Sequence, residues 1–108
     1  MASADILRAA RARIEDPKNW TAGQFARTLE GHPVTARSKK AVCWCALGAV
    51  AAEADGNDER LAALLLFKSS EALFGEEDIS IVNDGCGHEA VLKVFDAAIA
   101  VAEAEAGR

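Results

Sequence analysis

Hydrophobic side chains recur at helical spacing near both ends of the chain. The first such pattern predicts a helix that begins with Ser3 as its N-cap, runs to about Asp16 and is ended by Pro17. Its apolar positions fall on one face, at Ile6, Leu7, Ala10 and Ile14. The second pattern predicts a last helix from about His88 to Glu105. Its apolar positions are Val91, Leu92, Phe95, Ala98, Ile99 and Ala102.

The middle of the chain is nearly all apolar from Ala41 to Ala54, which predicts a central, buried helix. Within it, Gly48 would let another backbone approach closely. The turn at 55–57 should end this helix, with Asp58 capping the next one. That next helix is predicted to continue to Phe74, with Ser69 and Ser70 marking a point where it could break.

Three shorter segments complete the pattern. Thr21 as N-cap with Gln24 three residues later forms a capping box, and Trp20 and Phe25 could pack as a hydrophobic staple. This predicts a short helix over 22–29 and makes Trp20 a core anchor. Residues 30–40 should be a loop with a brief extended piece at 34–35. The alternation over 79–82 predicts a short extended segment, followed by a turn over 83–87.

These elements predict a mainly α protein. We expect a compact bundle of four to five helices around the central apolar helix, with one or two short extended segments. The 108 residues fit one helical domain spanning 1–108. Alanine accounts for 24 residues, which favours helix but leaves a thin core, because each alanine buries little area.

Composition and charge narrow the setting. No apolar run approaches the ~20 residues that span a bilayer, and the N-terminus lacks the layout of a secretory signal. Three cysteines, an odd number, fit a reducing compartment, so a cytoplasmic protein without a membrane partner is expected. The net charge is −5, with four Lys/Arg against thirteen Asp/Glu after residue 40. Nucleic acid is therefore not an expected partner, because the acidic part would repel its phosphates.

Sulfur and polar side chains gather at two predicted helix beginnings, Cys43-Trp44-Cys45 and 83–88. One interpretation is a cysteine-dependent hydrolase or transferase. Cys45 would be the nucleophile, because a helix beginning favours thiolate. His88 would accept its proton, and Asp84 or Asn83 would orient the imidazole. Neither a Gln-x-x-x-x-x-Cys nor a Cys-Gly-Ser-Cys signature accompanies these residues.

Zinc is a second interpretation. Thiolate and imidazole suit tetrahedral Zn²⁺, and the candidate ligands would be Cys43, Cys45, Cys86 and His88. Their spacing is poor, since two helical residues with one between them point about 200° apart. The pair at 43 and 45 could converge only if the helix began after Cys45. A third, purely structural interpretation needs no cofactor: buried cysteines, a packed Trp44, and capping by Asn83 and Asp84.

Several stretches resemble a family of small uncharacterised proteins found in tailed phages and in bacterial genomes that carry phage remnants. They are 16–21, 41–49 with its Trp-Cys-x-x-Gly-Ala core, the Asn-Asp pair at 83–84, and 91–99. The resemblance covers about residues 5 to 102 and implies a setting rather than an activity. The positions that match the family are Trp20, Cys45, Gly48, Asn83 and Asp84, whereas Cys43, Cys86 and His88 match less closely.

The leading hypothesis is therefore a non-enzymatic accessory protein that binds a macromolecule or a small ligand and modulates host systems. The expected binding groove would be formed by Trp20, Trp44, Asn83 and Asp84. The cysteine-dependent enzyme and a zinc-stabilised structural module stay open as alternatives, and a homodimer stays open as a partner. The triad, metal and groove proposals all require the helix beginnings near Cys45 and His88 to meet in space.

Overall fold

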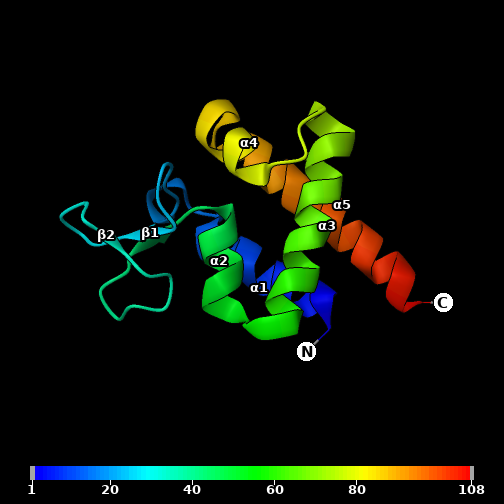
Figure 1. The fold of residues 1–108 in the computed structure, drawn as a ribbon, viewed down its shortest axis with the longest axis horizontal. Helices are drawn as coiled ribbons and strands as arrows, with labels where there is room; N and C mark the ends of the chain where they lie inside the picture. Colours follow the sequence, from blue (N-terminus) through cyan, green and yellow to red (C-terminus); the bar gives the residue numbers. More distant parts are fainter. Residues whose placement is uncertain (1, 108) are drawn as a thin grey trace.

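A computed structural model describes residues 2–107 and contains five α-helices beside a small sheet (Figure 1). The helices are α1 (Ser3–Ile14), α2 (Ala46–Glu53), α3 (Gly56–Phe74), α4 (Ile79–Cys86) and α5 (His88–Ala106), with a 3₁₀ turn, η1 (Pro17–Asn19). Helix α1 packs against both α2 and α5, and α5 is in turn covered by α3 and α4. The fully buried Leu7, Val50 and Phe95 lie in this common core. No described helix is long and apolar enough to cross a membrane.

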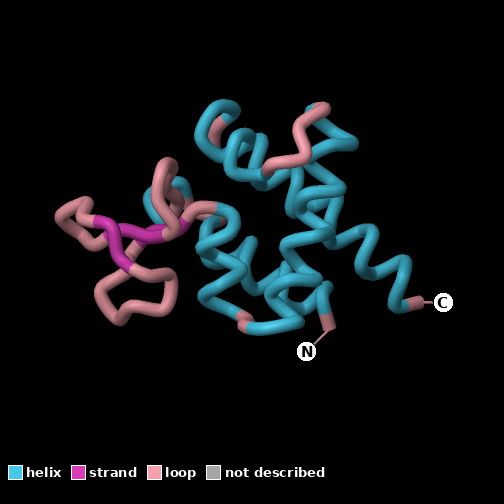
Figure 2. Tube along the Cα trace, viewed as in Figure 1, coloured by secondary structure: helices cyan, strands magenta, loops and turns pink. Residues whose placement is uncertain are grey.

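Three two-residue strands form a sheet to one side of the helices (Figure 2). Strand β1 (Ala26–Arg27) lies between β2 (Pro33–Val34) and β3 (Cys43–Trp44), and both pairings are antiparallel. Ala26 is opposite Val34 on one side and Trp44 on the other. Since Ala26 is buried, the sheet is fixed to the rest of the molecule at its central strand.

The mainly α architecture predicted from the apolar pattern is confirmed. Helices α1 and α5 follow the predicted faces. Helix α3 forms where predicted and runs through Ser69 and Ser70 without a break, but it buries Ala62 and Leu66 while the larger Leu61 and Leu64 are exposed. The first helix differs in its ends. Ala2 rather than Ser3 is the N-cap, and the helix ends at Ile14. Asp55 occupies the N-cap position of α3, where the sequence predicted Asp58.

The predicted helix over 22–29 is wrong, and this part of the chain forms turns and then β1. The Thr21 hydroxyl accepts a hydrogen bond from Arg27 Nε instead of capping a helix. Gly23 adopts a φ of +82°, which interrupts any right-handed helix. Phe25 is 58% exposed and is therefore not stapled against a buried partner. Tertiary pairing has overridden a local capping signal.

Two further boundaries are corrected. Cys43 and Trp44 form β3, and α2 begins only at Ala46, because Val42 N and Cys45 N donate to the carbonyls of Arg27 and Phe25. Residues 79–82 form helix α4 rather than an extended segment, and the helix continues to Cys86, so the predicted turn over 83–87 is wrong as well. The Asp78 side chain caps α4 by accepting from Ser80 N.

Candidate functional site

The beginning of α2 and the middle of α4 meet, and Asn83 joins them. This side chain is 1% exposed. Its Oδ1 accepts hydrogen bonds from Ala46 N at 3.0 Å and from Trp20 Nε1 at 2.9 Å. Its Nδ2 donates to the carbonyl of Thr21 at 3.1 Å. One amide group therefore fixes the beginning of α2 and the segment after η1 to α4.

Asp84, the neighbour of Asn83, fixes the same segment from the surface. Its Oδ1 accepts from Gly23 N at 2.9 Å and from Asn83 Nδ2 at 3.0 Å. The turn at Gly23 requires a positive φ, and Asp84 satisfies its backbone N–H in that conformation. The Asn-Asp pair thus sets the path of residues 20–25.

Cys45 is the N-cap of α2, and its Sγ accepts from Gly48 N at 3.3 Å. Burial raises the pKa of the Cys45 thiol, and the negative charge of Asp84 acts in the same direction. Hydrogen bonds from the backbone N–H groups of Gly48 and Leu47 oppose this shift without overcoming it. The helix beginning predicted to favour thiolate therefore holds a protonated, buried thiol.

Gly48 lies where the 23–25 segment crosses α2. A Cβ atom at this position would lie 1.9 Å from the carbonyl oxygen of Phe25, so only glycine fits. Cys45 N donates to that same carbonyl at 3.2 Å. The backbone of Phe25 is therefore held directly against α2, as the sequence predicted for an unspecified partner of Gly48.

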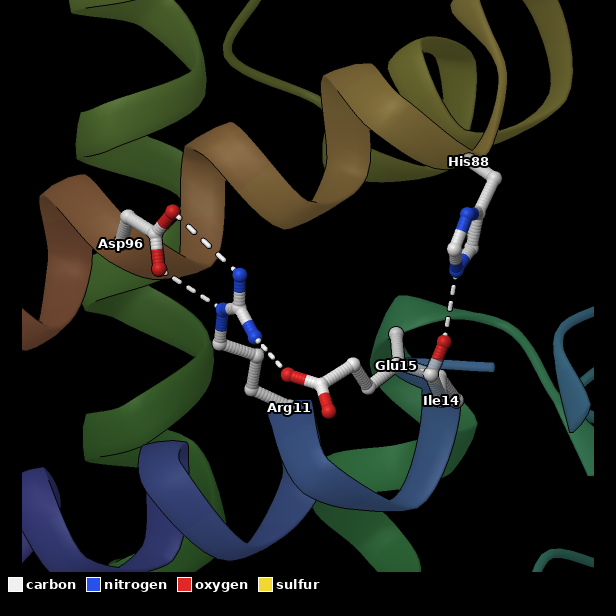
Figure 3. A network of polar contacts seen from close by, with 5 residues as sticks. All are labelled: Arg11, Ile14, Glu15, His88 and Asp96. Carbon is white, nitrogen blue, oxygen red and sulfur yellow. Dashed lines mark hydrogen bonds and ion pairs between the residues drawn. The ribbon is translucent and has the colours of Figure 1, made fainter. Parts of the chain in front are cut away.

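His88 occupies a different position, at the joint between α1 and α5 (Figure 3). Its Nε2 donates to the carbonyl of Ile14 at 2.6 Å, and its ring lies 5.6 Å from that of Trp20. Beside it, the Arg11 guanidinium bridges Asp96 and Glu15. Among the described residues, Cys45 and His88 do not form a hydrogen-bonded pair, because the imidazole bonds the Ile14 carbonyl and the Cys45 thiol accepts from Gly48 N. His88 is also absent from the residues that line the surface pocket at Cys45 and Asp84.

The proposed zinc ligands are not brought together. Cys43 Sγ lies 4.0 Å from the carbonyl of Arg27, and Cys86 is exposed at the end of α4. Over residues 2–107, no group of three or more His, Cys, Asp or Glu side chains could hold a metal ion. Although α2 does begin after Cys45, Cys43 belongs to β3 and is directed by the sheet rather than by the helix.

The predicted groove is divided between two places. Trp20 is half-buried and packs on the core, as expected of an anchor. Trp44 donates through Nε1 to the carbonyl of Ala36 at 2.9 Å, and Arg13 lies 4.6 Å above its ring. Trp44 therefore supports the 36–44 loop and lines a separate hollow, away from Asn83 and Asp84.

A pocket of about 160 Å³ lies where the junction reaches the surface. Cys45, Asn83 and Asp84 line it, together with residues that sequence reasoning did not select: Gly23, Gln24, Phe25, Ala46, Leu47 and Ser80. The missed signal is Gly23 between Thr21 and Phe25, because a glycine at this position weakens a helix and permits the turn that exposes Phe25. We call this pocket of about 160 Å³ the Phe25 pocket.

The three cysteines should differ strongly in their rate of alkylation. Iodoacetamide at mildly alkaline pH is expected to modify exposed Cys86 first and Cys45 at least about tenfold more slowly, because attack requires an accessible thiolate. Peptide mapping by mass spectrometry after timed quenching would measure both rates. Rapid, selective modification of Cys45 in folded protein would contradict this arrangement and revive the nucleophile hypothesis.

Comparison with known proteins places the chain in a family without assigning an activity. No curated protein and no solved structure matches it. The model of a family of unknown function, DUF6197, matches residues 1–101. This range includes Trp20, Cys45 and the Asn-Asp pair that build the junction. The chain belongs to the DUF6197 family, a family of unknown function.

Proposed function

We propose that this chain is a non-enzymatic accessory protein, of the kind encoded by phages and prophages, that acts by binding another macromolecule through the Phe25 pocket. The phage setting rests on the resemblance of the Trp-Cys-x-x-Gly-Ala core and the Asn-Asp pair. The binding function rests on the geometry around Phe25.

The observation that carries the proposal is an exposed aromatic side chain on an immobilised backbone. The Phe25 carbonyl is packed against Gly48 and accepts from Cys45 N, while Gly23, two residues earlier, is held by Asp84. The side chain is nevertheless 58% exposed. A pre-positioned aromatic group loses little conformational entropy on binding, which favours its use as an anchor at an interface.

The Phe25 pocket taken alone is smaller than a typical cofactor site. Pockets for small-molecule ligands typically enclose about 300–1,000 Å³. The Phe25 pocket encloses about 160 Å³ and is open, so it suits one apolar side chain of a partner. The absence of His88 from its lining and the protonated Cys45 thiol favour binding over cysteine-dependent catalysis.

Affinity capture tests this function. Tagged protein would be incubated with lysate of a phage-infected bacterium, and captured proteins compared between the wild type, Phe25→Ala and Val101→Ala. Both side chains are large, apolar and exposed, but Val101 lies on α5, outside the Phe25 pocket. We expect a captured protein that Phe25→Ala loses and Val101→Ala retains. Equal capture by all three forms, or a hydrolytic activity abolished by Cys45→Ala, would overturn the proposal.

A further inference from the structure

Two further hollows lie next to the Phe25 pocket and are linked to it through shared lining side chains. A second hollow shares Phe25 and Leu47 with the pocket and extends along α3 to Phe67. A third hollow shares Phe67 and reaches the turn at 76–78. The elements that surround these hollows are the 23–25 segment, α2, α3 and α4, whose arrangement can be followed in Figure 1. We call the surface formed by these three hollows the Phe25 groove.

One face of α3 forms the floor of the groove. Gly56, Arg60, Ala63 and Phe67 line it, at intervals of four, three and four residues. Residues at this spacing share one face of a helix. At a rise of 1.5 Å per residue, the 11 steps from Gly56 to Phe67 span about 16 Å, the length of about three helical turns. The groove therefore matches a short helical segment, one apolar side chain of which would occupy the Phe25 pocket.

The rim of the groove is acidic. Its three hollows are lined by five carboxylates: Asp84, Glu59, Glu76, Glu77 and Asp78. Within residues 2–107, Arg60 is the one basic side chain that lines them. None of the five carboxylates pairs with a lysine or arginine in the described part of the chain.

Backbone hydrogen bonds at the rim do not remove its charge. Glu76 accepts from Asp78 N, and Asp78 accepts from Ser80 N, so both carboxylates help to form the turn before α4. The donors in these bonds are backbone N–H groups without a formal charge, so the bonds place no positive charge beside the carboxylates. The rim would therefore attract cations to a surface that is apolar at its base, and it would repel the phosphates of nucleic acids and acidic lipids.

We propose that the Phe25 groove binds an amphipathic helical segment of a partner protein, with large apolar side chains on one face and lysine or arginine beside them. This inference rests on the proposed binding function and specifies its partner class. The apolar side chains would pack on Phe25, Leu47 and Phe67, and the cations would lie against the acidic rim. Recognition of this type lays the apolar face of a helix into a groove.

Three synthetic peptides of about 14 residues would probe the groove, with lengths set by three to four helical turns. The first carries leucine and lysine at amphipathic spacing. The second replaces each lysine with glutamate, and the third replaces each leucine with alanine. By fluorescence anisotropy, we expect the leucine–lysine peptide to bind at least about tenfold more tightly than either control, and more weakly at high salt. Equal affinity for all three peptides would overturn the inference.

Two matched triple variants locate the charge effect. The groove variant is Glu59→Gln/Glu76→Gln/Glu77→Gln, and the control is Glu30→Gln/Glu89→Gln/Glu105→Gln, whose side chains are exposed outside the groove. Each removes the same net charge, and each changes one glutamate in the first turn of a helix. We expect the groove variant to weaken binding of the leucine–lysine peptide about tenfold and the control to change it less than about twofold. Equal weakening by both variants would contradict a local rim.

Leu47→Ala tests the apolar lining that α2 contributes and should weaken binding of the same peptide about tenfold, with circular dichroism confirming the fold. Should the lysate partner depend on Phe25 while the leucine–lysine peptide fails to bind, the cationic-helix inference is overturned and the proposed function stands. Should the wild-type protein instead form concentration-dependent oligomers that Leu47→Ala abolishes, the occupant is a second copy of this chain, which also overturns the inference.

Discussion

Gly48→Ala is expected to lower the free energy of unfolding by about 3 kcal/mol, at the upper end of what overpacking usually costs. The added methyl group would lie 1.9 Å from the Phe25 carbonyl oxygen, a separation that real Cβ atoms do not adopt. Neither neighbour can yield cheaply. The carbonyl belongs to a backbone held by Cys45 N, and Gly48 lies in the first turn of α2 on a fully buried side of the helix.

Gly85→Ala is the matched control for this substitution. Gly85 lies within α4, has no positive φ, and has no atom within 4 Å of an added Cβ. Because alanine has the higher helix propensity, this change should stabilise the protein by up to about 1 kcal/mol. Urea unfolding followed by circular dichroism would measure both free energies. Equal unfolding midpoints for the two variants would show that Phe25 does not cross α2 at Gly48.

The elements that could be predicted from sequence are those in which buried side chains recur at helical spacing over many residues. Helices α1 and α5 each bury one face over at least three turns, so many positions agree on the period. Helix α4 has only eight residues. Its first four, Ile79 to Val82, satisfy an alternating pattern as well as a helical one. The pair buried in the structure is Ile79 and Val82, three residues apart, while Ile81 is 56% exposed.

The candidate site was predicted in part. Residue type identified several of its positions, but it did not reveal which way each side chain points. Cys45 and the Asn-Asp pair were selected as chemically unusual and Trp20 as a core anchor, and the structure does bring them to one junction. The direction of each side chain depends on tertiary pairing, which no local pattern contains. His88 was therefore expected beside Cys45 but bonds Ile14. Phe25 was assigned to a staple, although the turn at Gly23 leaves it exposed.

The Asn-Asp pair would contribute to the proposed binding function by holding the backbone around Phe25. Asn83 and Asp84 direct most of their polar atoms into the protein, toward Trp20, Thr21, Gly23 and Ala46. They shape the Phe25 pocket by fixing the backbone that presents Phe25, and a partner would contact the aromatic ring they position. Residues whose polar side chains suggest direct chemistry can thus act indirectly, by positioning the side chain that a partner would contact.

Asn83→Ala is expected to lower the free energy of unfolding by about 4 kcal/mol, because its removal leaves three buried or partly buried polar groups without a partner, each at a cost of about 1–3 kcal/mol. These groups are Trp20 Nε1, Ala46 N and the carbonyl of Thr21. Asn83→Leu, which fills the volume but makes no hydrogen bond, should lose a similar amount. Urea unfolding monitored by tryptophan fluorescence would measure these losses.

Asp84→Ala separates the buried junction from its exposed edge. Asp84 is exposed, so water can replace it at Gly23 N, and its substitution should cost about 1 kcal/mol. The ratio of the unfolding free energy lost in Asn83→Ala to that lost in Asp84→Ala is the decisive quantity. Losses at Asn83 no greater than those at Asp84 would mean that water reaches the junction. If Asn83→Leu has the same free energy of unfolding as the wild type, packing rather than the hydrogen bonds of the Asn83 amide holds α2, α4 and residues 20–21 together.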